Sequence, residues 1–235
     1  MKGKTLAALA SLIMLLVCAF GTPRRMHSRD AKSPYPNMAP LEQYLMDRDA
    51  EIALARTAAP ESISGDATVV VLGRHGYETA VQGKNGFVCI VERSWNNLFD
   101  SREFWNPKVR GADCLNPPAA RSVLAIMYLR ARLALAGLSK TEMIANIKAG
   151  YDKKELPPLE PGSMSYMMSK GSYLNDDGSH NMAHLMFYTE LMDGANWGAD
   201  LPKSPVHLIP VFRGVPEPVN VFIVPTRSWS DGTPQ

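Results

Sequence analysis

The chain has 235 residues, of which 46% are apolar, so it is long enough to bury a sizeable core in one domain or two small ones. It carries 25 Lys and Arg against 23 Asp and Glu, and two of the lysines, Lys2 and Lys4, belong to a start that we expect to be removed. The remaining chain is then neutral, which argues against nucleic acid as the main partner and against electrostatic attraction to an anionic membrane, because both need a cationic surface.

The first 21 residues predict a secretory signal peptide. Lys2 and Lys4 precede an apolar run, Leu6–Phe20, and Ala19-Phe20-Gly21 has the small-x-small pattern that signal peptidase reads. The run is shorter than the roughly 20 residues that a membrane-spanning helix needs. We therefore expect a mature protein that begins near Thr22, is periplasmic or secreted, and has no stable membrane insertion.

Two other interpretations of this start remain open. Cys18 suggests a lipoprotein signal, although Val17 before it is not the small residue expected there. Arg24 and Arg25 follow the apolar run directly and weaken the charge asymmetry that sets orientation, as in an uncleaved anchor.

Residues 22–40 predict a flexible leader, because they are rich in Pro, Arg, Ser and Lys and show no apolar period. Apolar residues then recur at helical spacing over Leu41–Ala59, which predicts a helix that Pro60 ends. We expect the folded domain to run from residue 41 to 230.

Three strands are predicted next, over Ala67–Leu72, Tyr77–Gln82 and Phe87–Arg93. Gly73 to Gly76 separates the first two, and the Asn85-Gly86 dipeptide, which favours a tight hairpin turn, separates the last two. The pattern indicates a three-stranded antiparallel meander.

Residues 94–118 are predicted to be irregular, with several aromatic and proline residues. Once the signal is removed, the chain has only two cysteines, Cys89 and Cys114. In an oxidising compartment an even pair favours a disulfide, which would close a loop of 25 residues and pin this segment. The alternative is that Cys89 is a buried apolar residue in its strand.

The clearest helix is predicted over Ala119–Leu138, where the apolar residues form one stripe. Ser139 and Glu142 form a capping box that begins a second helix. Four strand-like segments complete the chain: Met164–Met168, Ala183–Tyr188, Val206–Phe212 and Val219–Pro225. The order of elements predicts an α+β fold, a mainly antiparallel sheet with about three helices packed on it.

The common catalytic and phosphate-binding signatures are missing, so candidate residues come from local context. His75 lies in a glycine-framed turn, where a histidine suits acid or base chemistry, and Arg74 beside it suits a carboxylate or phosphate. Asn85 in its turn, together with Tyr166 and Ser169 after an apolar run, completes the predicted ligand-binding set.

His180 and His184 are the metal candidates. Four residues apart on a helix they would share one ion, but on a strand they would stand about 13 Å apart. On a strand, His180, Met182, His184 and Met186 form a stripe of soft ligands that suits cuprous copper. Adaptable core packing by methionine is the competing explanation.

Several segments resemble a family of uncharacterised bacterial exported proteins: Ala67–Gly73, Gly83–Cys89, Ser165–Ser169 and His184–Tyr188. The resemblance implies a bacterial, exported, single-domain protein and supplies no catalytic residues or cofactor. Our leading hypothesis is a domain that binds a small molecule or an envelope component in a cleft near the Arg74-His75 turn. The alternatives are a hydrolase or lyase with His75 and His184 as acid and base, and copper handling by the His/Met stripe.

Overall fold

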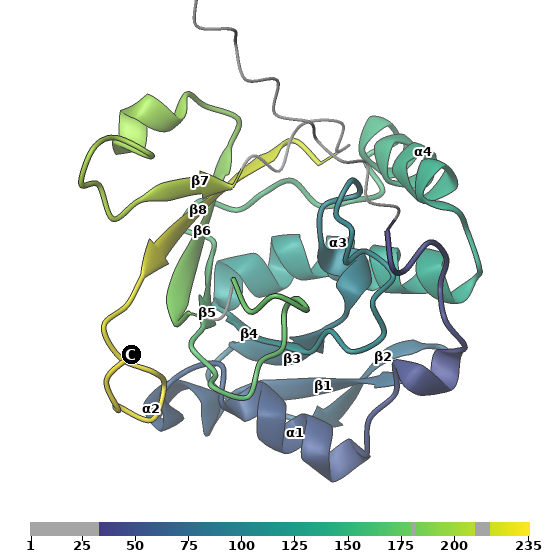
Figure 1. Cartoon of the computed structure of the whole chain (residues 1–235), viewed down its shortest axis with the longest axis horizontal. Coiled ribbons are helices and arrows are strands. Elements are labelled where there is room, and N and C mark those ends of the chain that lie inside the picture. The colour runs from purple at the N-terminus through teal and green to yellow at the C-terminus, as the bar shows by residue number, and fades with distance from the viewer. Residues whose placement is uncertain (1–32, 180–181, 210–216) are drawn as a thin grey trace, which may run out of the picture. The chain divides into compact units, whose positions relative to one another are not determined.

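An eight-stranded sheet with helices on both faces forms the centre of the protein (Figure 1). The computed structural model describes residues 33–179, 182–209 and 217–235, and these belong to one compact unit, Lys32–Gln235. The predicted signal peptide, Cys18 and the first part of the predicted leader lie outside the described residues.

The strands follow the order β2-β1-β3-β4-β5-β6-β8-β7 across the sheet. The strands are β1 (Thr68–Gly73), β2 (Gly76–Val81), β3 (Val88–Glu92), β4 (Gly111–Leu115), β5 (Met164–Met167), β6 (His184–Glu190), β7 (His207–Ile209) and β8 (Val219–Pro225). The helices are α1 (Arg48–Arg56), the single turn α2 (Glu61–Ser64), α3 (Pro117–Leu135) and α4 (Lys140–Asp152). Neighbouring strands are antiparallel except β1 and β3, which confirms the predicted α+β class.

The two faces of the sheet bury different sets of strand residues, because successive side chains along a strand point to opposite faces. The core under α1 includes Ala55, Val69, Cys89, Val91 and Cys114. The core under α3 includes Val70, Ile90, Leu115, Leu124 and Met127. Helix α4 packs on α3, and Met143 and Ile147 are its fully buried residues in a third core.

The predicted meander is wrong in one pairing. β1 and β2 form an antiparallel hairpin, but β3 lies on the other side of β1 and runs parallel to it. The segment between β2 and β3 crosses the start of β1, where a Cβ on Gly83 would collide with the backbone of Thr68. Asn85-Gly86 therefore turns the chain within a crossover and not within a hairpin.

The predicted helix over Leu41–Ala59 is shorter than expected. Leu41–Gln43 is a turn of 3-10 helix, and α1 begins only after Asp47, whose Oδ1 accepts the Ala50 N–H at 3.0 Å. The interruption buries Tyr44, whose hydroxyl donates to the Trp105 carbonyl at 2.8 Å. A tertiary contact thus overrides the local helical pattern.

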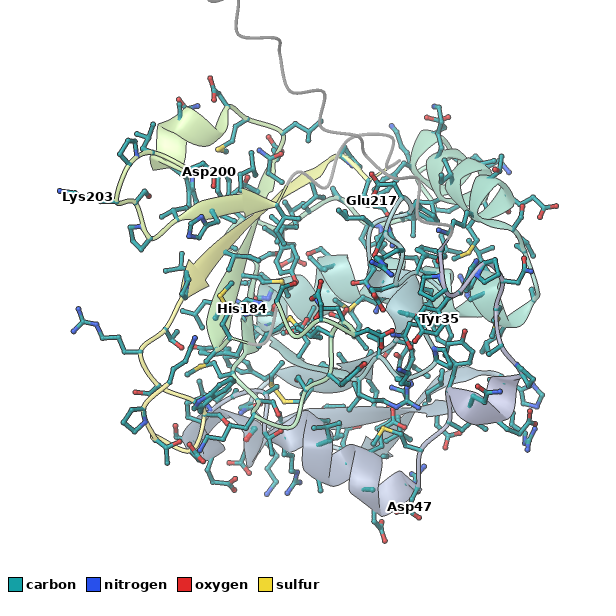
Figure 2. The ribbon with its side chains drawn as sticks, in the orientation of Figure 1. Tyr35, Asp47, His184, Asp200, Lys203 and Glu217 are labelled. Carbon is teal, nitrogen blue, oxygen red and sulfur yellow. A yellow bond between two sulfur atoms is a disulfide. The ribbon has the colours of Figure 1, made fainter. Side chains whose placement is uncertain are left out.

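The predicted flexible leader is too long at its C-terminal end, because residues 33–40 pack on the domain. The Ser33 hydroxyl donates to the Arg102 carbonyl at 2.7 Å, and the Tyr35 hydroxyl donates to Asp176 at 2.7 Å. Lys108 Nζ also donates to Asp176 and lies 5.9 Å from the centre of the Tyr35 ring, which is labelled in Figure 2.

The predicted irregular stretch contains a strand that sequence reasoning missed. β4 has the sequence Gly-Ala-Asp-Cys-Leu, in which Gly and Asp are poor strand formers, yet all five residues are buried. Helix α3 then begins two residues earlier than predicted. Pro117 and Pro118 occupy its first turn, where prolines are tolerated, and Asn116 caps it by accepting the Ala119 N–H.

The predicted disulfide between Cys89 and Cys114 is present. The two residues are direct partners in the antiparallel pair of β3 and β4. The bridge therefore closes the base of the segment that leads from β3 to β4, and it fits a protein that folds in an oxidising compartment.

Candidate functional site

The Arg74-His75 turn is an exposed hairpin tip between β1 and β2. Arg74 Nη1 donates to Glu42 Oε1 at 3.0 Å, and both side chains are more than 60% exposed. His75 is exposed as well, and Gly76, with φ of +125°, allows the tight return. Ligand binding at this turn stays a prediction.

The other predicted binding residues lie apart from this turn and serve local structure. Asn85 Oδ1 accepts the Phe87 N–H at 3.0 Å within its own turn. The Tyr166 ring packs 6.4 Å from that of Phe87. Ser169 is buried, with its hydroxyl 2.5 Å from that of Thr57.

His184 is buried at the start of β6, so it lies on a strand and not on a helix (Figure 2). Its Nδ1 lies 2.8 Å from the carbonyl oxygen of Met182, and because a carbonyl only accepts, Nδ1 carries the proton. Met186 lies on the same face of β6 as His184. Met167 of β5 is the residue paired with His184 across the two strands. His180 lies outside the described residues, and among those described no group of three or more His, Cys, Asp and Glu could hold a metal ion. Copper handling stays a prediction.

His75 and His184 are not brought together. His75 follows β1, and strands β3, β4 and β5 lie between β1 and β6. At a strand spacing of about 4.8 Å, the two residues are about 19 Å apart across the sheet. This separation counts against the predicted pairing of the two rings as acid and base.

A large cleft lies between α3 and the part of the sheet formed by β3 to β8. We call it the α3 cleft, and its volume is about 1330 Å³. Its apolar wall includes Val123, Ile126, Met127, Leu156, Leu159, Met167, Met186, Ile209 and Val221. Its polar wall includes Glu92, Asn96, Arg130, Tyr151, Glu155, Tyr188 and Glu217. Arg74, His75, Asn85, Tyr166 and Ser169 do not line it, whereas Met186 of the predicted copper stripe does.

Four polar side chains cross the α3 side of the sheet in a row, one from each of β3, β4, β5 and β6. They are Glu92, Asp113, Ser165 and Tyr188. Glu92 pairs with Gly111, so Asp113, two residues further along β4, lies diagonally across from it on the same face. The Ser165 and Tyr188 hydroxyls are 3.1 Å apart. Glu92 and Tyr188 reach the cleft, whereas Asp113 and Ser165 are fully buried behind them.

The two carboxyl groups form a coupled pair. Burial raises the pKa of Asp113 well above its usual range, and the adjacent Glu92 raises it further by charge and by hydrogen bonding. Burial also raises the pKa of Glu92, while the neighbouring polar groups of Asp113 and Asn96 and the charge of Arg130 oppose that shift. Neither Asp113 oxygen has a hydrogen bond of standard geometry. We infer that Asp113 holds the proton and presents it to Glu92.

The arginines near the pair are fully engaged within the protein. Arg130 Nη2 lies 2.6 Å from Glu217 Oε1, and its Nη1 donates to two main-chain carbonyls. Arg93 Nη2 lies 2.9 Å from Glu51 Oε2, and its other donors reach the carbonyls of Tyr44 and Val91. Both ion pairs are buried, so neither arginine is available to neutralise Asp113.

Sequence reasoning missed this site because its residues are scattered. The polar row draws one residue from each of four strands spread between positions 92 and 188. The available signals were weak: a glutamate that ends an apolar strand, and an aspartate between Ala112 and Cys114. Neither has the spacing of a known motif.

No family model, curated protein or solved structure matches this chain. Within the described ranges, no helix is long and apolar enough to cross a membrane.

Proposed function

We propose that the protein is an exported binding protein that holds a small, largely apolar molecule in the α3 cleft. The cleft itself carries this proposal. Its volume of about 1330 Å³ is above the usual 300–1,000 Å³ of small-molecule sites, and apolar side chains with a few inward polar groups are the typical lining of such sites.

The apolar wall supports a lipid-like envelope component or a hydrophobic metabolite over a sugar or nucleotide. Side chains from α3, β5, β6 and β8 supply it, and its methionines are adaptable to ligand shape. The Cys89–Cys114 disulfide supports an extracytoplasmic location, as does the predicted signal peptide. The resemblance to bacterial exported proteins is consistent with both.

A cleft-filling substitution tests the proposal. Ile126 lies on α3 and lines the cleft, so Ile126→Trp would occupy part of its volume with an indole. Ala145 is exposed on α4, outside the lining, so Ala145→Trp is the matched control. We expect the neutral fluorescent probe N-phenyl-1-naphthylamine to bind the wild-type protein and Ala145→Trp saturably, and to bind Ile126→Trp at least about tenfold more weakly.

Native mass spectrometry of protein purified from the periplasm would then identify any molecule carried through purification. Equal probe affinity in all three proteins, or no saturable binding in the wild type, would contradict the proposed function. Circular dichroism and a thermal melt establish that both tryptophan variants are folded.

A further inference from the structure

We propose that Glu92, backed by Asp113, is an anionic subsite of the α3 cleft that binds the cationic head, an amine or ammonium group, of an amphiphilic ligand. This inference rests on the proposed function, since it assigns a chemical class to the molecule that the cleft holds.

The position of the pair carries the inference. Glu92 lines the cleft, and Asp113 lies behind it with no exposed surface. A ligand in the cleft therefore meets Glu92 and not Asp113. The surrounding wall is mainly apolar, so a charge on Glu92 is weakly screened and interacts strongly with an opposite charge placed beside it.

Among the described residues that line the cleft wall around Glu92, the protein supplies no free cation. The charge of Arg130 acts on Glu92, and the ion pair of Arg130 with Glu217 offsets that charge. Arg93 is paired with Glu51. A buried carboxyl pair without a cation is costly to ionise, so a ligand cation would supply what is missing.

The charge of the whole cleft points to the same ligand class. Its wall contains five glutamates, Glu92, Glu103, Glu155, Glu190 and Glu217, against three bases, Arg93, Arg130 and Lys154. Two of those bases are in the ion pairs described above. The excess of acidic groups opposes the entry of a fatty carboxylate and favours an amphiphilic cation.

Asp113 allows binding of the cation to be coupled to the release of a proton from Glu92. When a cation approaches, Glu92 ionises, while Asp113 keeps its proton and donates a hydrogen bond to the Glu92 carboxylate. The groups facing the pair are the uncharged Ser165 of β5, Tyr188 of β6, Tyr77 of β2 and Asn96, and the cationic Arg130 of α3. Burial raises the pKa of both tyrosines, so they stay neutral.

Three probes of equal chain length separate head-group charge from apolar binding: octylamine, 1-octanol and octanoate. Each is measured by displacement of N-phenyl-1-naphthylamine at neutral pH. We expect octylamine to bind at least about tenfold more tightly than octanol, and octanoate to bind most weakly. Calorimetry in two buffers of different ionisation enthalpy should show proton release on binding octylamine and none on binding octanol.

Two variants assign the effect to the subsite. Glu92→Gln should lower octylamine affinity to that of octanol and leave octanol affinity unchanged. Glu78→Gln removes an exposed glutamate of β2, outside the cleft, and should preserve the preference for the amine. If Glu92→Gln does not fold, the pH dependence of binding to the wild-type protein tests the subsite instead. Its ratio of amine to alcohol affinity should rise with pH, as Glu92 loses its proton.

The outcomes are distinguishable. Equal affinities for octylamine and octanol, or a ratio that does not change with pH, would overturn the cationic subsite and leave the binding function standing. A preference that survives in Glu92→Gln would place the cation elsewhere and also overturn it. Absence of probe binding in the wild type would overturn the proposed function itself.

Discussion

Asp113 is a charged residue type in a fully buried strand position, between Ala112 and Cys114. A lone buried carboxylate is strongly disfavoured, and proteins usually respond by keeping the group neutral. Here the response falls on Asp113, because burial and the adjacent Glu92 both raise the pKa of its carboxyl. At the scale of single residues, the protonation of this pair is the property that most distinguishes the cleft.

Asp113→Asn should change how the stability of the protein depends on pH. The pKa of Asp113 is raised in the folded protein, so below about pH 4 both folded and unfolded states are protonated and the carboxyl brings no penalty. As pH rises, the unfolded state loses its proton first, and the wild-type protein loses stability by up to about 1.4 kcal/mol per pH unit. The asparagine variant lacks this loss.

Urea titrations at a series of pH values measure this effect. The free energy of unfolding of Asp113→Asn minus that of the wild type should increase from about pH 4 toward neutral pH. The variant Asp152→Asn, at an exposed position on α4, provides a control that lacks a buried carboxyl. A constant difference across the pH range would show that Asp113 is not held protonated.

At the scale of elements, helix boundaries follow local capping chemistry more closely than apolar periodicity. The predicted capping box is present: the Glu142 N–H donates to Ser139 Oγ at 3.3 Å, and the Ser139 N–H donates to Glu142 Oε2 at 2.8 Å. Asp47 and Asn116 cap α1 and α3 with their side chains, which accept the N–H groups of Ala50 and Ala119. Apolar periodicity alone predicted a start of α1 that is too early, since periodicity carries no information about the N-cap at Asp47.

Ser139→Ala should destabilise the protein by about 1 kcal/mol, because it leaves a first-turn N–H of α4 without its acceptor. Packing of Met143 and Ile147 in the core keeps the helix formed in the variant. Thr141→Ala, at an exposed position in the first turn of the same helix, should be neutral or slightly stabilising. Chemical denaturation of the three proteins checks this order, and equal losses in both variants would contradict the assigned cap.

At the scale of the whole molecule, one covalent link joins the two central strands that carry the carboxyl pair. The Cys89–Cys114 disulfide connects β3 to β4 on the α1 side of the sheet, and Glu92 and Asp113 belong to the same two strands on the α3 side. The bridge therefore supports the register that brings Glu92 next to Asp113.

Replacing both cysteines by alanine should lower the free energy of unfolding by about 3 kcal/mol, because the unfolded chain gains the freedom of a 25-residue loop. Guanidinium unfolding with and without a reductant measures the loss. The double variant should be insensitive to reductant, and the reduced wild-type protein should approach its stability. A wild-type protein that does not respond to a reductant able to open the bridge would contradict a stabilising role.

Local sequence patterns determined a large part of this fold. Short apolar segments bounded by turn residues located seven of the eight strands, and the capping box and the apolar stripe located α4 and α3, because these signals arise within a few residues of the chain. The cysteine count also predicted the disulfide, since an even pair of cysteines in a chain expected to be exported favours a bridge.

Tertiary structure alone decided the strand order and the candidate site. The parallel pairing of β1 with β3 depends on a crossover that no turn motif predicts. β4 is a strand only because neighbouring strands and helices bury it on both sides. The carboxyl pair arises from the register of β3 and β4, and the row extends to Ser165 and Tyr188 through two further pairings. Contacts between residues so distant along the chain leave no periodic trace in the sequence, so the site became visible only once the sheet was assembled.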